Sequence, residues 1–227
     1  MSTSVQEMAL RSPNAGSARL AARRNAGSRQ EILAATRTVI ARVGPAALRV
    51  EHVAVELGVT KQALYHYYPS KEAVLFEVVI DELVAVAHAV DQAARAAPDG
   101  AGALEAIIRT YAAHFLPRLE MHRLVTMFVP TPETFRATPE VLARIRPIND
   151  LLYGAAEARL AAERRPRRRD PRGPRRLAFT AHLAVLGLLT MRTITDSMQD
   201  PLLDTDAELV DELVRTYRAA AEKDKTR

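Results

Sequence analysis

Residues 58–75 read GVTKQALYHYYPSKEAVL and decide the fold of the first third of the chain. Gly58 suits the end of one helix, and Thr60 can cap the next one. Pro69 blocks continuation of that second helix, because its ring clashes with the preceding turn. Ser70 can then cap a further helix. The stretch therefore predicts a short helix between Thr60 and Pro69 and another helix directly after Ser70.

The residues upstream predict two more helices. Ser28 and Glu31 have the spacing of a capping box, and apolar residues follow at helical spacing as far as Gly44. Between residues 50 and 57, apolar side chains recur at positions i, i+3, i+4 and i+7, which predicts a short amphipathic helix. Two short helices joined by a tight turn at Gly58 are typical of a helix-turn-helix.

The remainder of the chain is also predicted to be helical. Neither glycine nor proline interrupts residues 71–97, which indicates one long helix. The arginine- and proline-rich segment 163–176 is predicted to be a linker, and no run alternates with a period of two. We therefore expect an all-α fold of about nine helices. The further helices are expected at 102–116, 118–128, 139–164 and 177–197, and after Thr205.

Charge is concentrated at the N-terminal end of the chain. Residues 1–75 hold 10 Lys/Arg and 5 Asp/Glu, a net charge of +5, whereas the remainder holds 22 of each. This asymmetry indicates an anionic partner for the first third, although a solvated basic tail would look the same. The chain has no cysteine, which suits a reducing compartment. We expect a cytoplasmic protein without a membrane span, because the apolar run 177–191 looks too short for a bilayer.

The segment from Gly58 to Leu75, with the elements back to Ile32 and Leu33, resembles the N-terminal domain of the TetR family of transcriptional regulators. The resemblance covers roughly residues 28–78 in motif order and spacing. It implies a homodimer that binds a palindromic operator on double-stranded DNA and is released by a small-molecule effector. It also implies a helix-turn-helix domain at 28–75 and a ligand-binding and dimerisation domain at 76–227, whereas the polar, aperiodic composition of residues 1–27 predicts a flexible basic arm.

The same resemblance assigns residues to DNA contact. The helix after Thr60 would enter the major groove, and Lys71 would bind a phosphate. Leu64 and Tyr68, one turn apart, would face the core. The chain has Arg49 where the family commonly has Ser or Thr, and Tyr67-Tyr68 where the family often has His-Phe. The expected DNA-binding residues are Arg29, Arg49, Val50, Glu51, Thr60, Lys61, Gln62, Ala63, Tyr65, His66, Tyr67 and Lys71.

Two other basic segments keep two interpretations open. Arg19, Arg23 and Arg24 either enter a minor groove or stay solvated. The arginines of residues 164–176 would lie far from the DNA-binding helices in this architecture, which favours a solvated loop.

Effector binding is expected in the C-terminal domain, where pocket and core residues share the same composition. Candidate pocket residues are Tyr111, His114, Phe115, Met121, Phe128, Tyr153, His182 and Met191. The last two helices are expected to form the dimer interface. We expect no metal or other cofactor, because the histidines lack convincing ligand spacing, and no enzyme activity, because no nucleophile has a plausible base beside it. The alternative is a helix-turn-helix dimer without a small-molecule switch, acting in nucleoid association or protein contacts.

Overall fold

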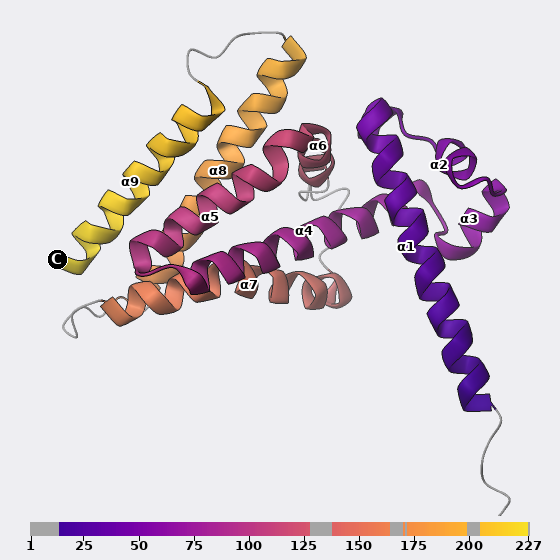
Figure 1. The fold of residues 1–227 in the computed structure, drawn as a ribbon, viewed down its shortest axis with the longest axis horizontal. Helices are drawn as coiled ribbons and strands as arrows, with labels where there is room; N and C mark the ends of the chain where they lie inside the picture. Colours follow the sequence, from indigo (N-terminus) through magenta and orange to yellow (C-terminus); the bar gives the residue numbers. More distant parts are fainter. Residues whose placement is uncertain (1–13, 128–137, 164–169, 171, 199–204, 227) are drawn as a thin grey trace, which may run out of the picture.

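The computed structural model describes residues 14–127, 138–163, 170, 172–198 and 205–226. Within these ranges the chain is all-α, which confirms the predicted fold class. Helices α1 to α3 lie at one end of the molecule, α4 runs from them along the other helices, and α5 to α9 form the larger bundle (Figure 1). The elements are α1 Asn14–Ala47, α2 Val50–Leu57, α3 Lys61–Tyr67, α4 Lys71–Ala96, α5 Gly100–Phe115, the 3₁₀ helix η1 Leu116–Arg118, α6 Leu119–Met127, α7 Pro139–Glu163, α8 Gly173–Met198 and α9 Asp206–Thr226.

The first helix differs from its prediction at the start and agrees with it at the end. The helix α1 begins at Asn14 and not at Ser28, so residues 14–27 are helical and not an irregular arm. The rest of the predicted arm, residues 1–13, lies outside the described residues. At the other end, Gly44 has φ +75° and ψ 161°, which interrupts the helix at the predicted glycine. The division into three regions stays a prediction.

The caps predicted between α2 and α4 are present. Gly58 takes the left-handed conformation, with φ +66°, at the C-terminal end of α2. The Thr60 hydroxyl accepts a hydrogen bond from the Ala63 N–H at 3.3 Å, and the Ser70 hydroxyl accepts one from the Ala73 N–H at 3.1 Å. Each hydroxyl satisfies an N–H that has no partner within its helix, which is why these helices begin where they do.

The larger bundle is built around α5, which packs against α4, α7, α8 and α9. The Asp99 carboxylate caps α5 by accepting from the Gly102 N–H at 2.6 Å. A Cβ at Gly100 would lie 2.8 Å from Leu160 Cδ2 of α7, so glycine permits this close approach. The last helix begins at a capping box in which the Thr205 N–H donates to Glu208 and the Glu208 N–H donates to Thr205.

The helix α8 is longer than predicted. It begins at Gly173, so residues 173–176 are helical and not part of the linker, whereas residues 164–169 lie outside the described residues. The helix extends beyond the apolar run 177–191, and its segment Gly173–Thr195 is long and apolar enough to cross a membrane by length and composition alone. A core helix of a soluble protein passes the same test. Only 33% of the apolar window is buried within one protomer.

Candidate nucleic-acid interface

Two side chains anchor α3 to the core of the N-terminal domain. Leu64 and Tyr68 are 5% and 6% exposed, as the sequence predicts. Arg29 of α1 lies over the Tyr68 ring, with 5.3 Å between Cζ and the ring centroid. Burial raises the pKa of the Tyr68 phenol, so this side chain remains neutral in the core. The anchors turn the opposite face of α3 toward solvent.

That outer face presents five of the residues expected to contact DNA. They are Lys61, Gln62, Ala63, Tyr65 and His66, and all are exposed. The Lys61 ammonium is ion-paired with the Glu51 carboxylate of α2 and lies 5.5 Å from the centroid of the Tyr65 ring. The hydrogen bond between them lowers the pKa of Glu51 and raises that of Lys61. Both groups are fully exposed, so a phosphate or a base edge can compete for Lys61.

A groove of about 460 Å³ lies beside this face, between the start of α2 and the start of α4. Arg49, Glu51, Tyr65 and Lys71 line it. Lys71 Nζ donates to the Ala46 carbonyl at 3.3 Å, which joins the start of α4 to the α1–α2 connection. Two lysine N–H bonds and the exposed Arg49 remain for an anion. The structure thus brings together residues 49 and 71, which are distant in sequence.

Four of the residues expected to contact DNA have a structural role within the domain. The Val50 side chain is only 9% exposed and packs in the domain core, so at most its backbone can reach DNA. Tyr67 is half-buried against the core, in edge-to-face contact with His66 at 5.5 Å. The Thr60 hydroxyl caps α3, and Arg29 covers Tyr68. The expected contacts of α3 that have no role in the core or in capping are therefore its remaining exposed residues.

His52 has a role that the sequence did not reveal. Its Nδ1 accepts a hydrogen bond from the Arg49 N–H at 3.4 Å, at the start of α2. The Ser or Thr that the family commonly has at position 49 would accept from N–H groups of the first turn, whereas here a histidine side chain satisfies the N–H before it. The Arg49 guanidinium therefore does not cap α2.

The candidate effector residues only partly converge. A chain of rings runs through the larger bundle with neighbouring centroids 4.5 to 5.6 Å apart. In order, these rings are Phe179, Tyr153, His182, Tyr111, Phe115 and His122. Met121 is buried on α6, whereas Met191 is 51% exposed on α8 and Phe128 lies outside the described residues. His122 was not among the candidate pocket residues predicted from the sequence.

His114 does not belong to this ring chain but contacts a buried carboxylate, that of Glu82. Its Nε2 lies 3.0 Å from Glu82 Oε2 on α4. Glu82 Oε1 accepts from Arg37 Nε of α1 at 2.7 Å, and Arg118 of η1 lies 3.3 Å from Oε2. Burial alone would raise the pKa of Glu82, but the hydrogen bonds from His114 and Arg37 and the positive charge of Arg118 lower it to about 2. This cluster, which we call the Glu82 cluster, ties α1, α4, α5 and η1 together.

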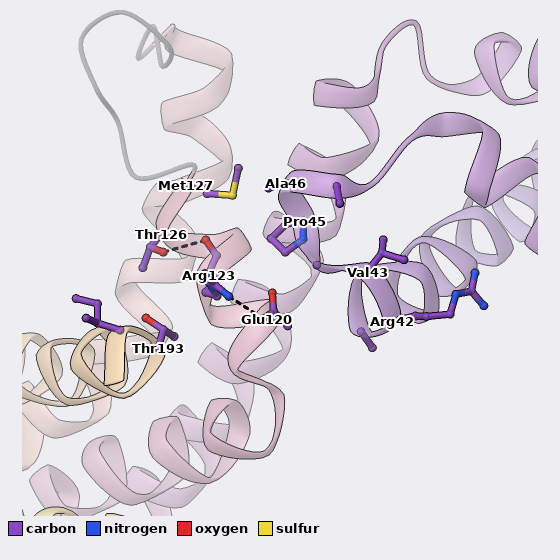
Figure 2. Close-up of a pocket in the computed structure, with 13 residues that line it drawn as sticks. Arg42, Val43, Pro45, Ala46, Glu120, Arg123, Thr126, Met127 and Thr193 are labelled. Carbon is purple, nitrogen blue, oxygen red and sulfur yellow. Dashed lines mark hydrogen bonds and ion pairs between the residues drawn. The ribbon is translucent and has the colours of Figure 1, made fainter. Parts of the chain in front are cut away.

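A second junction joins the N-terminal helices to the bundle. The end of α1 meets α6 and α8 around a groove of about 570 Å³. Figure 2 shows Pro45 of α1 facing Glu120 and Arg123 of α6, with Thr193 of α8 to the lower left of them. Glu120 and Arg123 are ion-paired at 2.9 Å, and a Cβ at Gly44 would lie 3.2 Å from the Glu120 carboxylate. A shift of α6 would therefore act directly on the end of α1.

Comparison with known proteins agrees with this architecture. Residues 32–78 match the family model described as bacterial regulatory proteins, tetR family. No curated protein matches the chain. Among solved structures, a TetR family transcription regulator from Marinobacter aquaeolei VT8 is 21% identical, with 87% of this chain and 97% of that chain covered and a TM-score of 0.61.

Two further solved structures share the fold. A protein of unknown function from Rhodococcus sp. RHA1 is 18% identical, with 85% of this chain and 94% of that chain covered and a TM-score of 0.65. The transcriptional regulator FadR from Bacillus subtilis, in complex with stearoyl-CoA, is 19% identical, with 85% and 96% covered and a TM-score of 0.58. At these identities the likeness shows the fold alone. The family match thus covers the helix-turn-helix at residues 32–78, and the likeness to the solved structures extends the shared fold over the remaining helices.

Proposed function

We propose that the protein is a homodimeric repressor that binds a palindromic operator through α3 and is released from it by a small-molecule effector. The observation that carries the DNA-binding part is the outer face of α3. There Lys61, Tyr65 and His66 are exposed while Leu64 and Tyr68 fix the helix from behind. A single exposed helix face of this kind fits the major groove of B-form DNA.

The roles of the DNA-facing residues follow from where they lie. Lys61, Gln62 and Tyr65 project from α3 and would meet base edges or the flanking phosphates. Arg49 and Lys71, beside the groove at the starts of α2 and α4, would bind the backbone on each side of α3. The backbone N–H groups of Val50 and Glu51 at the start of α2 offer a further phosphate contact.

Dimerisation is supported by an apolar stripe on α8. Phe179, Leu183, Met191 and Ile194 follow one another at helical spacing and are 44% to 51% exposed. Gly187 lies in the middle of this stripe, and a Cβ there would meet nothing within 4 Å. Contiguous exposed apolar surface on a soluble chain indicates a protein interface. A second copy that contributes its own α8 and α9 would bury this stripe in a four-helix interface.

Release by an effector requires contacts that transmit a displacement in the larger bundle to α3. The structure offers two: the contact of α6 with Gly44 and Pro45, and the Glu82 cluster, which holds Arg37 of α1. An effector that prefers one arrangement of α6 and α4 would shift the population of dimers whose two α3 helices match grooves ~34–36 Å apart. The structural neighbour from Bacillus subtilis was solved with stearoyl-CoA, which supports a small-molecule effector in this fold.

The rival is a dimeric DNA-binding protein without an effector switch. It is favoured by the tight burial of the ring chain, in which Tyr111, Phe115 and His122 are at most 1% exposed. Two imidazole nitrogens of that chain, His122 Nδ1 and His182 Nε2, have no partner among the residues that the structure describes, which favours the sensor because buried polar atoms usually have partners.

Selection of genomic DNA fragments with the purified protein would identify the operator, and gel-shift titrations at several salt concentrations would then test the assignment. Lys71→Ala should weaken operator and random DNA alike and reduce the salt slope by about one unit. Tyr65→Ala should weaken operator binding selectively, by about 1–3 kcal/mol. Arg95→Ala, an exposed position at the far end of α4, is the control and should change neither. Unchanged affinity in the first two variants would refute the proposed interface.

A further inference from the structure

A carboxylate of α2 lies against the exposed face of α3. Glu51, in the first turn of α2, accepts a hydrogen bond from the Lys61 ammonium at the start of α3. The two side chains are 53% and 45% exposed, and Lys61 Nζ lies 5.5 Å from the centroid of the Tyr65 ring. Glu51 and Tyr65 also line the same groove. The carboxylate therefore lies next to the side chains that the proposed function assigns to base edges.

A negative charge at this place opposes general attraction to DNA. Phosphates repel the Glu51 carboxylate, and the ion pair neutralises Lys61, which would otherwise add to sequence-independent binding. The hydrogen bond from Lys61 lowers the pKa of Glu51, so the carboxylate is ionised at neutral pH. An acidic residue in a first turn also interacts favourably with the helix dipole, but that interaction requires no contact with α3. The pairing with Lys61 therefore needs a further explanation.

The ion pair presents a donor and an acceptor side by side, which is the complement of a base-pair edge. In the major groove of a G·C pair, guanine O6 accepts and the neighbouring cytosine N4 donates. The Lys61 ammonium can donate to guanine O6 and N7 while the Glu51 carboxylate accepts from cytosine N4. Lysine commonly contacts guanine and glutamate accepts from cytosine, so the two residues indicate the same base pair.

An A·T pair fits these two side chains less well. If Lys61 donates to thymine O4, the thymine methyl group lies where guanine would offer its second acceptor, N7. The Glu51 carboxylate could accept from adenine N6, but it would then lie beside adenine N7, which is another acceptor and repels it. The G·C pair thus makes the larger number of favourable contacts.

We propose that Glu51 is a specificity-determining residue, and that Glu51 and Lys61 together read one G·C base pair in each half of the operator. The inference rests on the proposed function and names a base pair that the α3 face recognises. On random DNA, Glu51 holds Lys61 and repels phosphates, which keeps sequence-independent binding weak. On the operator both side chains turn to the base pair, so the repulsion is offset only where guanine and cytosine occupy this position.

The first test selects tight-binding sequences from a library of randomised DNA duplexes with the full-length wild type, Glu51→Ala and Lys61→Ala. We expect both variants to relax the base preference at one shared position of each half-site, and wild type to select G·C there. Glu56→Ala is the matched control, because Glu56 lies on the same helix and pairs with Arg42 of α1. It should select the wild-type sequences. An unchanged preference in Glu51→Ala, or a shared position that is not G·C, would overturn the proposal.

Gel-shift titrations measure the size of the effect. Wild type should prefer its selected duplex about tenfold over one in which this G·C is replaced by A·T. Glu51→Ala should discriminate at least about threefold less between the two duplexes. On random duplex it should bind more tightly than wild type, with a salt slope steeper by about one unit per subunit, because Lys61 becomes free for a phosphate. Equal discrimination, or no gain on random duplex, would overturn the proposal.

Two other outcomes separate this inference from its alternatives. If Glu51 only stabilised α2, Glu51→Ala would lower the midpoint of thermal unfolding and keep the wild-type base preference, which would overturn the proposal. If wild type and Glu51→Ala enrich the same sequence, the role of Glu51 fails and the DNA-binding function stands. If wild type enriches no sequence, the proposed function fails and the inference fails with it.

Discussion

Removal of the negative charge of Glu82 should destabilise the fold by about 2–3 kcal/mol at neutral pH. The conservative variant Glu82→Gln keeps the shape of the side chain and loses its charge. The carboxylate is 5% exposed and holds Arg37, His114 and Arg118. Its pKa falls from 4.5 to about 2, which corresponds to about 3 kcal/mol of stability when Glu82 is ionised. We take this figure as an upper value, because glutamine retains some hydrogen bonding.

The contribution of Glu82 to the stability of the fold should depend on pH. The carboxylate has a lower pKa in the folded state than in the unfolded state, so its contribution is present above about pH 4.5 and is lost as the pH falls toward 2. Urea unfolding of both proteins at neutral pH and at about pH 3 measures the effect. The difference between wild type and Glu82→Gln should be large at neutral pH and should shrink in acid.

A second Glu→Gln change on the same helix is the matched control. Glu77 pairs with Arg144 through two hydrogen bonds of 2.7 and 2.8 Å, but both side chains are about one-third exposed or more. An exposed pair is worth about 0–1 kcal/mol, so Glu77→Gln should have a small effect at any pH. A loss in Glu82→Gln no greater than that in Glu77→Gln would refute the view that burial makes the Glu82 cluster important.

The remaining predictions concern the proposed dimer interface and the backbone strain at Gly44, near the end of α1. Leu183→Glu places a charge in the middle of the α8 stripe, so sedimentation should show dissociation to folded monomers, whereas Arg95→Glu at an exposed position of α4 should remain dimeric; a dimer in both would exclude this interface. Gly44→Ala forces a side chain onto φ +75° and should cost about 1–2 kcal/mol in urea unfolding. By contrast, Gly154→Ala within α7 meets nothing within 4 Å and should stabilise by about 0.5–1 kcal/mol; equal effects would contradict the strain at Gly44.

Local sequence signals predicted the helices well where the cap is a short-range hydrogen bond. Thr60, Ser70 and Thr205 each satisfy an N–H within three residues, so the sequence alone contains the partner. The capping box expected at Ser28 failed because the chain before it is also helical, so no free N–H group remains there to be capped. A capping pattern predicts a helix start only where the preceding residues cannot continue the helix.

The residues of the candidate site were predicted less accurately than the helices, and Val50 shows why. The apolar spacing that predicted α2 already placed Val50 on its buried face, whereas the family resemblance suggested a DNA contact at the same position. The structure agrees with the spacing. Tyr67 differs for a similar reason, since a seven-residue helix has few positions that face away from the core.

Glu82 was missed, although the sequence contains a signal for it. It occupies an apolar position of α4, with Val78 and Val79 one turn before it and Val86 one turn after it, all of them buried. A carboxylate at such a position predicts a buried ion pair, because an unpaired buried charge is too costly. Its partners could not be predicted, since Arg37 and His114 come from elements separated from Glu82 by 45 and 32 residues.

The two junctions between the N-terminal helices and the bundle differ in what they can transmit. The Glu82 carboxylate is buried and paired with Arg37, His114 and Arg118, so the cluster favours one arrangement of α1 against α4 and resists small displacements. The groove at Gly44 and Glu120 is open to solvent and contains an exposed ion pair, so α6 can move there at little cost. His122 lies on α6, two residues after Glu120, and its ring ends the chain that contains His182. A ligand that displaced α6 would therefore act first on the end of α1, whereas the Arg37–Glu82 pair would hold the middle of α1 against α4.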